Sequence, residues 1–112
     1  MFEPVATEGL KGQFSKLLKK SILDGMSNII GVDGARSIIV NFDLEPVMDN
    51  PRDFHRRLDV ALPVHGALVL ERAMIKELYR LLKERFEEDY GEFNYEASVH
   101  IAMKLFMASK AN

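Results

Sequence analysis

Hydrophobic residues between Gly66 and Phe86 recur at three- and four-residue steps, without the strict alternation of a β-strand. This spacing predicts a long amphipathic helix with a broad buried face. Glutamates on the opposite side can pair with basic residues three or four positions away. A helix this apolar on one face needs other helices to cover it, so the segment predicts an all-α fold. Its apolar stripe comprises Leu68, Leu70, Met74, Ile75, Leu78, Leu81, Leu82 and Phe86.

A second helical pattern runs from an N-cap at Thr7 to about Ile30, with lysines mostly opposite its apolar face. Gly25 lies inside this pattern, where glycine costs on the order of 1 kcal/mol relative to alanine. Such a glycine is often kept where a neighbouring backbone comes close. The sequence therefore predicts a tight helix contact at Gly25.

Gly31 is placed to end that helix, and Asp33 can cap a shorter one that reaches Phe42. The β-branched run SIIVNF also fits a short strand. Helix is preferred, because a lone strand would have no partner in this chain.

Turn residues predict a loop over 43–50. Asn50, Pro51 and Asp53 then form a helix start signal, with an N-cap, a proline at the first position and an acid at the third. This helix is expected to end before Pro63.

Together these patterns predict an all-α protein, a single-domain irregular antiparallel bundle of four to five helices. The helical domain is expected to span residues 7–112 after a flexible N-terminus at residues 1–6. A chain of 112 residues can bury roughly two-thirds of its unfolded surface. The expected core comprises Phe14, Leu18, Ile38, Phe42, Phe54, Leu58, Leu70, Met74, Leu78, Leu82, Met103 and Phe106.

The composition is ordinary for a globular domain, with 47% hydrophobic residues and a net charge of −2. That charge argues against a protein whose whole surface binds nucleic acid or an anionic membrane. No cysteine is present, which excludes disulfides and thiolate chemistry. No apolar run suggests a membrane span or a signal peptide. A cytoplasmic setting is therefore expected.

Acidic residues gather around the predicted loop, where their oxygens could hold a hard cation. They lack the ligand spacing and central glycine of an EF-hand, so a capping role for the following helix is preferred and no metal site is predicted. These residues are Asp43, Glu45, Asp49 and Asp53.

The three histidines, His55, His65 and His100, form no recognisable ligand pair. His55 falls on the polar side of its helix, and His100 is expected to be partly buried. Glu71 and His65 are candidate acid and base, but nothing in the sequence brings them together. No phosphate loop or nucleophile elbow is present. The sequence thus predicts no enzyme, no catalytic residue and no cofactor.

Four cations follow one face of the long helix, and α-helical spacing would let them track a phosphate backbone. A solvated face paired with the interleaved glutamates is preferred. Arg52, Arg56 and Arg57 could extend this surface. The candidate basic surface comprises Arg72, Lys76, Arg80 and Lys83.

The last helix is predicted to begin at an Asn94 cap and to reach about Ser109. It is apolar around nearly its whole circumference, which is typical of a helix that is buried centrally or covered by another subunit. Both interpretations remain open. The candidate interface for a homodimer or a partner protein comprises Val99, Met103, Phe106 and Met107.

The connection between the last two helices is acidic, with Glu87, Glu88 and Asp89 opposing the preceding helix C-terminus. We expect that helix to stop near Phe86 and the turn to be exposed. Replacing Glu87 and Glu88 with lysine is then expected to leave stability nearly unchanged.

The tract NPRDFHRRLDVALPVHGALVLERAMIKELYRLL resembles the second half of a family of small, all-helical archaeal proteins of unknown function. It couples a proline-started helix to a Gly66-Ala67 entrance and an I-x-x-x-L-Y helix that includes Ile75 and Tyr79. This chain has Pro63-Val64 where the family's turn would carry glycine. The resemblance implies a helical fold and a cytoplasmic setting, but no activity and no site residues.

The functional prediction is a non-enzymatic module for protein interaction or self-association. The alternative is binding of nucleic acid or a phosphate ligand through the basic helix face.

Overall fold

The computed structural model describes residues 3–40, 50–63, 65–86 and 93–111, with side chains described from Gly9 to Lys110. This part of the chain forms helices and no strand, so the predicted all-α class is confirmed for it. In order, the helices are α1 (Glu3–Ile39), α2 (Pro51–Ala61), α3 (Gly66–Leu82) and α4 (Tyr95–Ala111).

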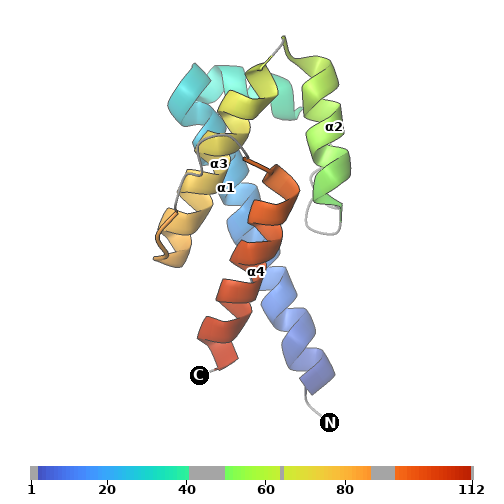
Figure 1. The fold of residues 1–112 in the computed structure, drawn as a ribbon, viewed down its shortest axis with the longest axis vertical. Coiled ribbons are helices and arrows are strands. Elements are labelled where there is room, and N and C mark those ends of the chain that lie inside the picture. The colour runs from blue at the N-terminus through green and yellow to red at the C-terminus, as the bar shows by residue number, and fades with distance from the viewer. Residues whose placement is uncertain (1–2, 41–49, 64, 87–92, 112) are drawn as a thin grey trace.

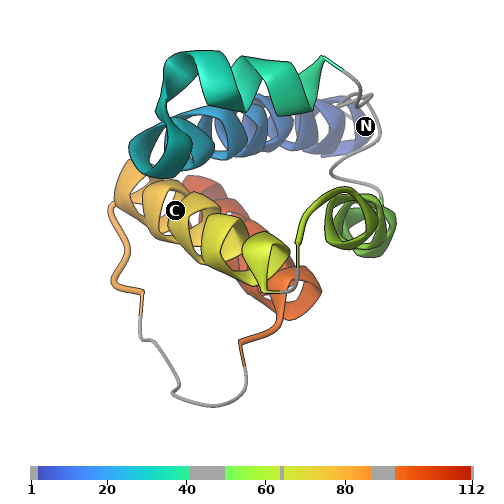
Figure 2. The same ribbon diagram turned by 90° about the horizontal axis from the view of Figure 1, so that it is seen from above.

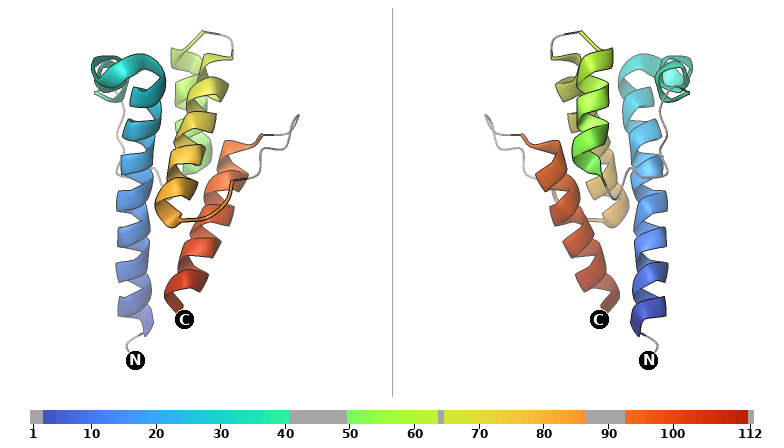
Figure 3. Two further views of the ribbon diagram at one scale, coloured as in Figure 1. Left: turned by 90° about the vertical axis from the view of Figure 1, so that its left-hand side faces the viewer. Right: turned by 90° about the vertical axis from the view of Figure 1, so that its right-hand side faces the viewer.

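The helices pack into an elongated body with principal extents of 48 × 30 × 22 Å (Figure 1). Helix α3 lies along α1 and runs in the opposite direction, and α2 is also antiparallel to α3 (Figure 3). Helices α3 and α4 instead point the same way (Figure 2 and Figure 3). The packing therefore combines antiparallel and parallel neighbours.

Helix α1 contains a sharp break at Gly31, whose φ of 83° and ψ of 163° are non-helical. A positive φ is easy only for glycine, so the predicted helix end at this residue is confirmed. The chain then resumes a helix that turns away from the first segment and buries Ala35 (Figure 3). Helix α1 begins at Glu3, not at Thr7, since Pro4 is tolerated in a first turn.

The contact between α1 and α3 is closest at Gly25. A Cβ atom built on Gly25 would lie only 2.5 Å from the Cα of Met74 and 2.8 Å from the carbonyl carbon of Ala73. No side chain fits between the two backbones at this point. The tight contact predicted at Gly25 is confirmed.

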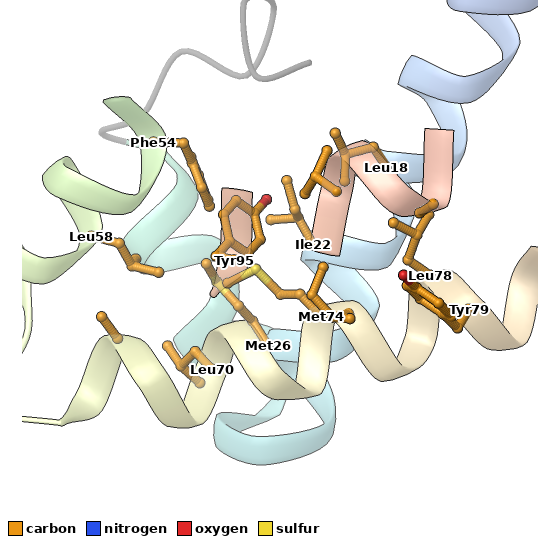
Figure 4. Packing of buried hydrophobic residues seen from close by; sticks show 14 of the residues in the cluster. Leu18, Ile22, Met26, Phe54, Leu58, Leu70, Met74, Leu78, Tyr79 and Tyr95 are labelled. Carbon is orange, nitrogen blue, oxygen red and sulfur yellow. The ribbon is translucent and has the colours of Figure 1, made fainter. Parts of the chain in front are cut away.

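The core lies between α1 and α3 and is closed by α2 and α4 (Figure 4). Eight of the expected core residues are buried: Phe14, Leu18, Phe54, Leu58, Leu70, Met74, Leu78 and Phe106. Ile38, Leu82 and Met103 are only partly buried against it. Further buried residues that the expected core list did not contain are Ile22, Met26, Ala35, Ala67, Ile75, Tyr79, Tyr95, Val99 and Ala102.

The N-caps predicted at Asn50 and Asn94 are confirmed. The side-chain oxygen of Asn50 accepts a hydrogen bond from the Asp53 N–H at 3.1 Å, and that of Asn94 accepts one from the Ala97 N–H at 2.9 Å. Each bond satisfies a first-turn donor that the helix itself leaves without a partner.

The predicted end of α3 near Phe86 is wrong by four residues. Lys83 adopts a left-handed conformation, with φ at 60°. Its N–H donates to Arg80 O, and the Glu84 N–H donates to Tyr79 O at 2.9 Å. This pair of bonds is a Schellman motif, in which lysine takes the position usually held by glycine. Periodicity alone could not locate it, because the apolar pattern continues through Phe86.

Several predictions lie outside the described residues. They concern Phe42 as a core residue, most of the 43–50 loop with three of its acids, and the acidic turn at 87–92.

Candidate functional site

The predicted basic surface divides between different parts of the molecule. Arg72, Lys76 and Arg80 line a hollow of about 600 Å³ between α1 and α3, together with Ile29 and Val69. Lys83 instead lines a second hollow of about 300 Å³, beside Lys110 of α4. The Schellman motif at Lys83 turns the chain away from the helical face, so the four cations do not form one continuous stripe. The arginines of α2 line neither hollow.

Arg72 is held inward at the edge of the basic surface. Its guanidinium carbon lies 5.6 Å from the centre of the Phe93 ring, within the range of a cation–π contact. Its Nε is buried and has no hydrogen-bond partner among the described residues. Arg80 is exposed and forms a short ion pair with Glu77. Lys76 and Arg80 are therefore the cations most accessible from the hollow.

The hollow between α1 and α3 also has an apolar floor, which we call the apolar–basic groove. Ile29 and Val69 expose 51% and 50% of their surfaces. On α3, Val69, Ala73, Lys76 and Arg80 follow at four- and three-residue steps, so one helix face carries both apolar and basic side chains. The close contact at Gly25 brings this face directly beside Ile29, four residues further along α1.

The predicted interface on α4 is largely covered by the chain itself. Val99 and Phe106 are buried in the core, where the Phe106 ring lies 5.7 Å from that of Phe14. Met103 and Met107 are partly buried against the same core. Most of this face is needed for intramolecular packing, which supports the central-core interpretation of α4. Ile101, on the other side, is 52% exposed.

The three histidines have different surroundings. His65 is exposed at the entrance to α3 with a φ of 68°, and its side chain makes no capping bond. His100 is exposed, so its predicted partial burial is wrong. His55 is the histidine with a buried partner. Its Nδ1 lies 2.6 Å from Oε2 of Glu71, which pairs Glu71 with a histidine other than the predicted candidate His65.

Glu71 is a buried carboxyl, with only 1% of its side chain exposed. Burial raises the pKa of Glu71 from 4.5 to about 7, because the charged form loses water; the hydrogen bond and charge of His55 oppose this rise, and the charge of Asp59 adds to it. The carboxyl thus exchanges its proton near neutral pH. Perturbed pairs of this kind are candidates for functional sites, although structural ion pairs also produce them.

His55 and Glu71 line a cavity of about 330 Å³ where α2, α3 and the start of α4 meet, which we call the α2–α4 pocket. Arg52 and Glu96 pair across its mouth, with Arg52 Nε 3.2 Å from Glu96 Oε1. The remaining lining residues are Leu68, Phe93, Asn94 and Tyr95.

Tyr95 packs its ring against Phe54, with centroids 5.7 Å apart. Its buried hydroxyl has no hydrogen-bond partner among the described residues. Burial raises the pKa of the Tyr95 phenol, and the negative charge of Glu71 adds to the effect. The phenol therefore remains neutral and contributes an uncharged donor beside the carboxyl.

One signal in the sequence could have located the pair. Glu71 falls between Ala67, Leu70, Met74 and Ile75, inside the apolar stripe of α3. His55 lies four residues after Pro51 and three before Leu58, so it sits at the edge of the buried face of α2 and not on the polar side as predicted. A charged residue inside an apolar stripe indicates a buried polar pair, because an unpaired buried carboxylate is too costly to keep. The identity of its partner on another helix is not encoded in the local pattern.

No protein-family model, curated protein or solved structure matches this chain. The resemblance to small archaeal proteins therefore stays a prediction. In the described part of the chain, each helix is too short or too polar to cross a lipid bilayer. The same residues contain no cluster of three or more histidine or acidic side chains arranged to hold a metal ion.

Proposed function

We propose that this protein is a non-enzymatic interaction module that binds an acidic amphipathic helix of a partner protein in the apolar–basic groove. The observation that carries the proposal is the combination of two half-exposed aliphatic residues, Ile29 and Val69, with Lys76 and Arg80 on the same groove. A helix that lies in such a groove places apolar anchors on its floor and acids beside its cations.

The charge of the groove supports an acidic partner. Arg72, Lys76 and Arg80 contribute three positive charges, and Glu77 is the acid that lines the hollow with them. Asp24 lies near enough to Arg80 to act on it, but Lys20 holds the Asp24 carboxylate at 2.9 Å. The local charge is thus positive on a protein whose net charge is −2, and such a patch steers and orients an acidic partner.

The apolar floor supports a protein partner over a nucleic acid. Phosphate recognition needs cations and hydrogen-bond donors, whereas burial of Ile29 and Val69 is favourable only against an apolar surface. The separation of Lys83 from the other cations also shortens the track available to a phosphate backbone. Nucleic-acid binding is the second candidate, and it rests on Lys76 and Arg80 alone. Self-association would place a second copy in the same groove.

The test uses a fluorescent amphipathic peptide of about 18 residues, roughly five helical turns, with leucines on one face and glutamates on the other. We expect it to bind the protein. Lys76→Glu with Arg80→Glu should weaken binding at least tenfold, because two attractive charges become repulsive. Val69→Asp should also weaken it, since the floor then carries a charge.

Arg56→Glu with Lys104→Glu is the matched control, because both residues are exposed outside the groove and the net charge changes equally. This control should keep its affinity, apart from the screened long-range effect of net charge. A peptide with lysines in place of the glutamates should not bind.

Other outcomes overturn the proposal. Tight binding to duplex DNA, single-stranded DNA or RNA at about 50 mM salt, lost in the Lys76/Arg80 variant and steeply dependent on salt, would establish the second candidate. A mass that doubles with concentration in sedimentation, and reverts on Val69→Asp, would establish self-association. If the groove variant and the control variant lost peptide affinity equally, the peptide would be responding to the net charge of the protein alone.

A further inference from the structure

The α2–α4 pocket presents hydrogen-bond donors in an arrangement that the interaction surface does not use. It lies beside α2, whereas the apolar–basic groove lies on the α1 side of α3, and the two share no lining residue. Its volume of about 330 Å³ falls at the lower end of the range for small-molecule sites. Leu68 and Phe93 provide apolar walls.

His55 is oriented by Glu71. The two nitrogens of an imidazole ring point in nearly opposite directions, so fixing Nδ1 on the buried carboxyl directs Nε2 away from it. The His55 side chain is 44% exposed and lines the pocket. In the ring forms that carry a proton on Nε2, this nitrogen donates a hydrogen bond on the exposed side. Glu71 lines the same pocket, and its Oε2 is engaged by Nδ1 of His55.

Arg52 already holds a carboxylate at the pocket mouth. Its Nε donates to Oε1 of Glu96 at 3.2 Å, and the Arg52 side chain is 71% exposed. The guanidinium has further N–H groups, so it can bind a second carboxylate or exchange Glu96 for one. The N-terminus of the 17-residue α4 begins at the same place and adds a positive dipole end.

We propose that the α2–α4 pocket binds a small carboxylic acid with a compact apolar body, held as the carboxylate between Arg52 and His55. The apolar body packs against Leu68 and Phe93. Glu71 is a positioning residue, because its Oε2 is engaged by Nδ1 of His55 and so orients the ring.

Benzoate is the probe, and backbone amide NMR of the whole protein is the measurement. Benzoate should shift the amides of Phe93, Asn94 and Tyr95 with millimolar affinity, and benzamide should not. This comparison needs no variant, because the two probes have the same shape and differ in charge. His55→Gln should weaken benzoate binding at least about tenfold, the equivalent of one charge-assisted hydrogen bond.

Glu96→Gln should change the affinity for benzoate in the opposite direction. It frees Arg52 from its competing carboxylate and should strengthen benzoate binding several-fold. The residue is partly exposed, so the fold is not at risk. Glu71→Gln should change the ring nitrogen shifts of His55, which report the orientation and protonation of the imidazole, and weaken benzoate binding. An effect on stability without that spectral change would assign Glu71 a structural role only.

The proposal is overturned if benzoate at about 20 mM, well above a millimolar dissociation constant, leaves these amides unshifted. Equal affinity for benzamide would also overturn it, because the pocket would then select shape and not charge. Weaker binding in Glu96→Gln would show that Arg52 does not hold the ligand. None of these results depends on the apolar–basic groove, so the two proposals fail separately.

Discussion

The contacts of helix α3 with α1 and with α2 differ in character. Against α1 it packs as an apolar seam, in which Ile22, Met26 and Leu78 are fully buried and Gly25 lets the backbones meet. Against α2 it combines apolar packing at Leu58 with a buried carboxyl–imidazole pair, Glu71 and His55. The first contact holds no titratable side chain at its centre. The contact with α2 contains Glu71, a carboxyl that exchanges its proton near neutral pH.

The two contacts differ in how burial affects the stability of the fold. Burial of apolar surface stabilises the seam at any ordinary pH. Burial of the Glu71 carboxyl removes the water that would solvate its charge, and such a pair rarely adds stability over an apolar pair of the same size. The presence of Glu71 in the stripe of α3 is therefore better explained by a role in the α2–α4 pocket than by a need for stability.

The largest expected effect lies in the seam. Leu78→Ala should lower the free energy of unfolding by about 2–5 kcal/mol, because it removes a fully buried side chain and leaves a cavity. The loss should be the same at pH 5 and pH 8, measured by chemical denaturation. A loss that differs by more than ~1 kcal/mol, a large effect for one substitution, would show that the seam is coupled to the titratable contact.

A pH-dependent effect is expected for Glu71→Gln. The folded-state pKa of Glu71, about 7, exceeds the ordinary value of 4.5. The native state then binds this proton more tightly than the unfolded state, so the stability it contributes is complete below 4.5 and is lost as pH rises through 7. The free energy of unfolding of Glu71→Gln, relative to that of the wild type, should therefore rise by about 2–3 kcal/mol between pH 5 and pH 8. Denaturant titrations of both proteins measure this difference.

The smallest of the three effects tests the close backbone contact. Gly25→Ala should destabilise by about 1–3 kcal/mol, since the new methyl group meets the backbone of Met74 and not a movable side chain. Gly12→Ala is the matched control, because nothing lies within 4 Å of its new methyl group. It should stabilise by up to ~1 kcal/mol through helix propensity. Thermal unfolding of both variants gives the comparison, and a stable Gly25→Ala would refute the seam geometry.

Local signals in the sequence were sufficient for most of the fold. The caps at Asn50 and Asn94, the break at Gly31 and the contact at Gly25 each follow from one residue's own conformational preference or size. The end of α3 could not be predicted in this way, because Lys83 adopts a positive φ that its residue type does not predict. Hydrophobic periodicity also does not show which residues of different helices contact each other. The sequence shows Glu71 inside an apolar stripe but cannot show that His55, 16 positions earlier, faces it.

The candidate surfaces also combine residues grouped by helical spacing with residues from other helices. Helical spacing correctly grouped Arg72, Lys76 and Arg80, which lie within three turns of one helix. It could not show that Ile29 of α1 lies beside them, which gives the groove its apolar floor. For α4, composition indicated a covered helix, and the tertiary packing of Val99 and Phe106 supports coverage by the chain's own core.

The contrast between the two contacts of α3 rests on the protonation of one carboxyl. The direct measurement is an NMR titration of the side-chain carboxyl carbon of Glu71 in the folded protein between pH 3 and pH 9, a range that brackets the ordinary and raised values. The structure predicts a midpoint at about 7, raised from 4.5 by burial. A midpoint close to 4.5 would contradict the account, because it would show that Glu71 is solvated and that α2 and α3 do not enclose it.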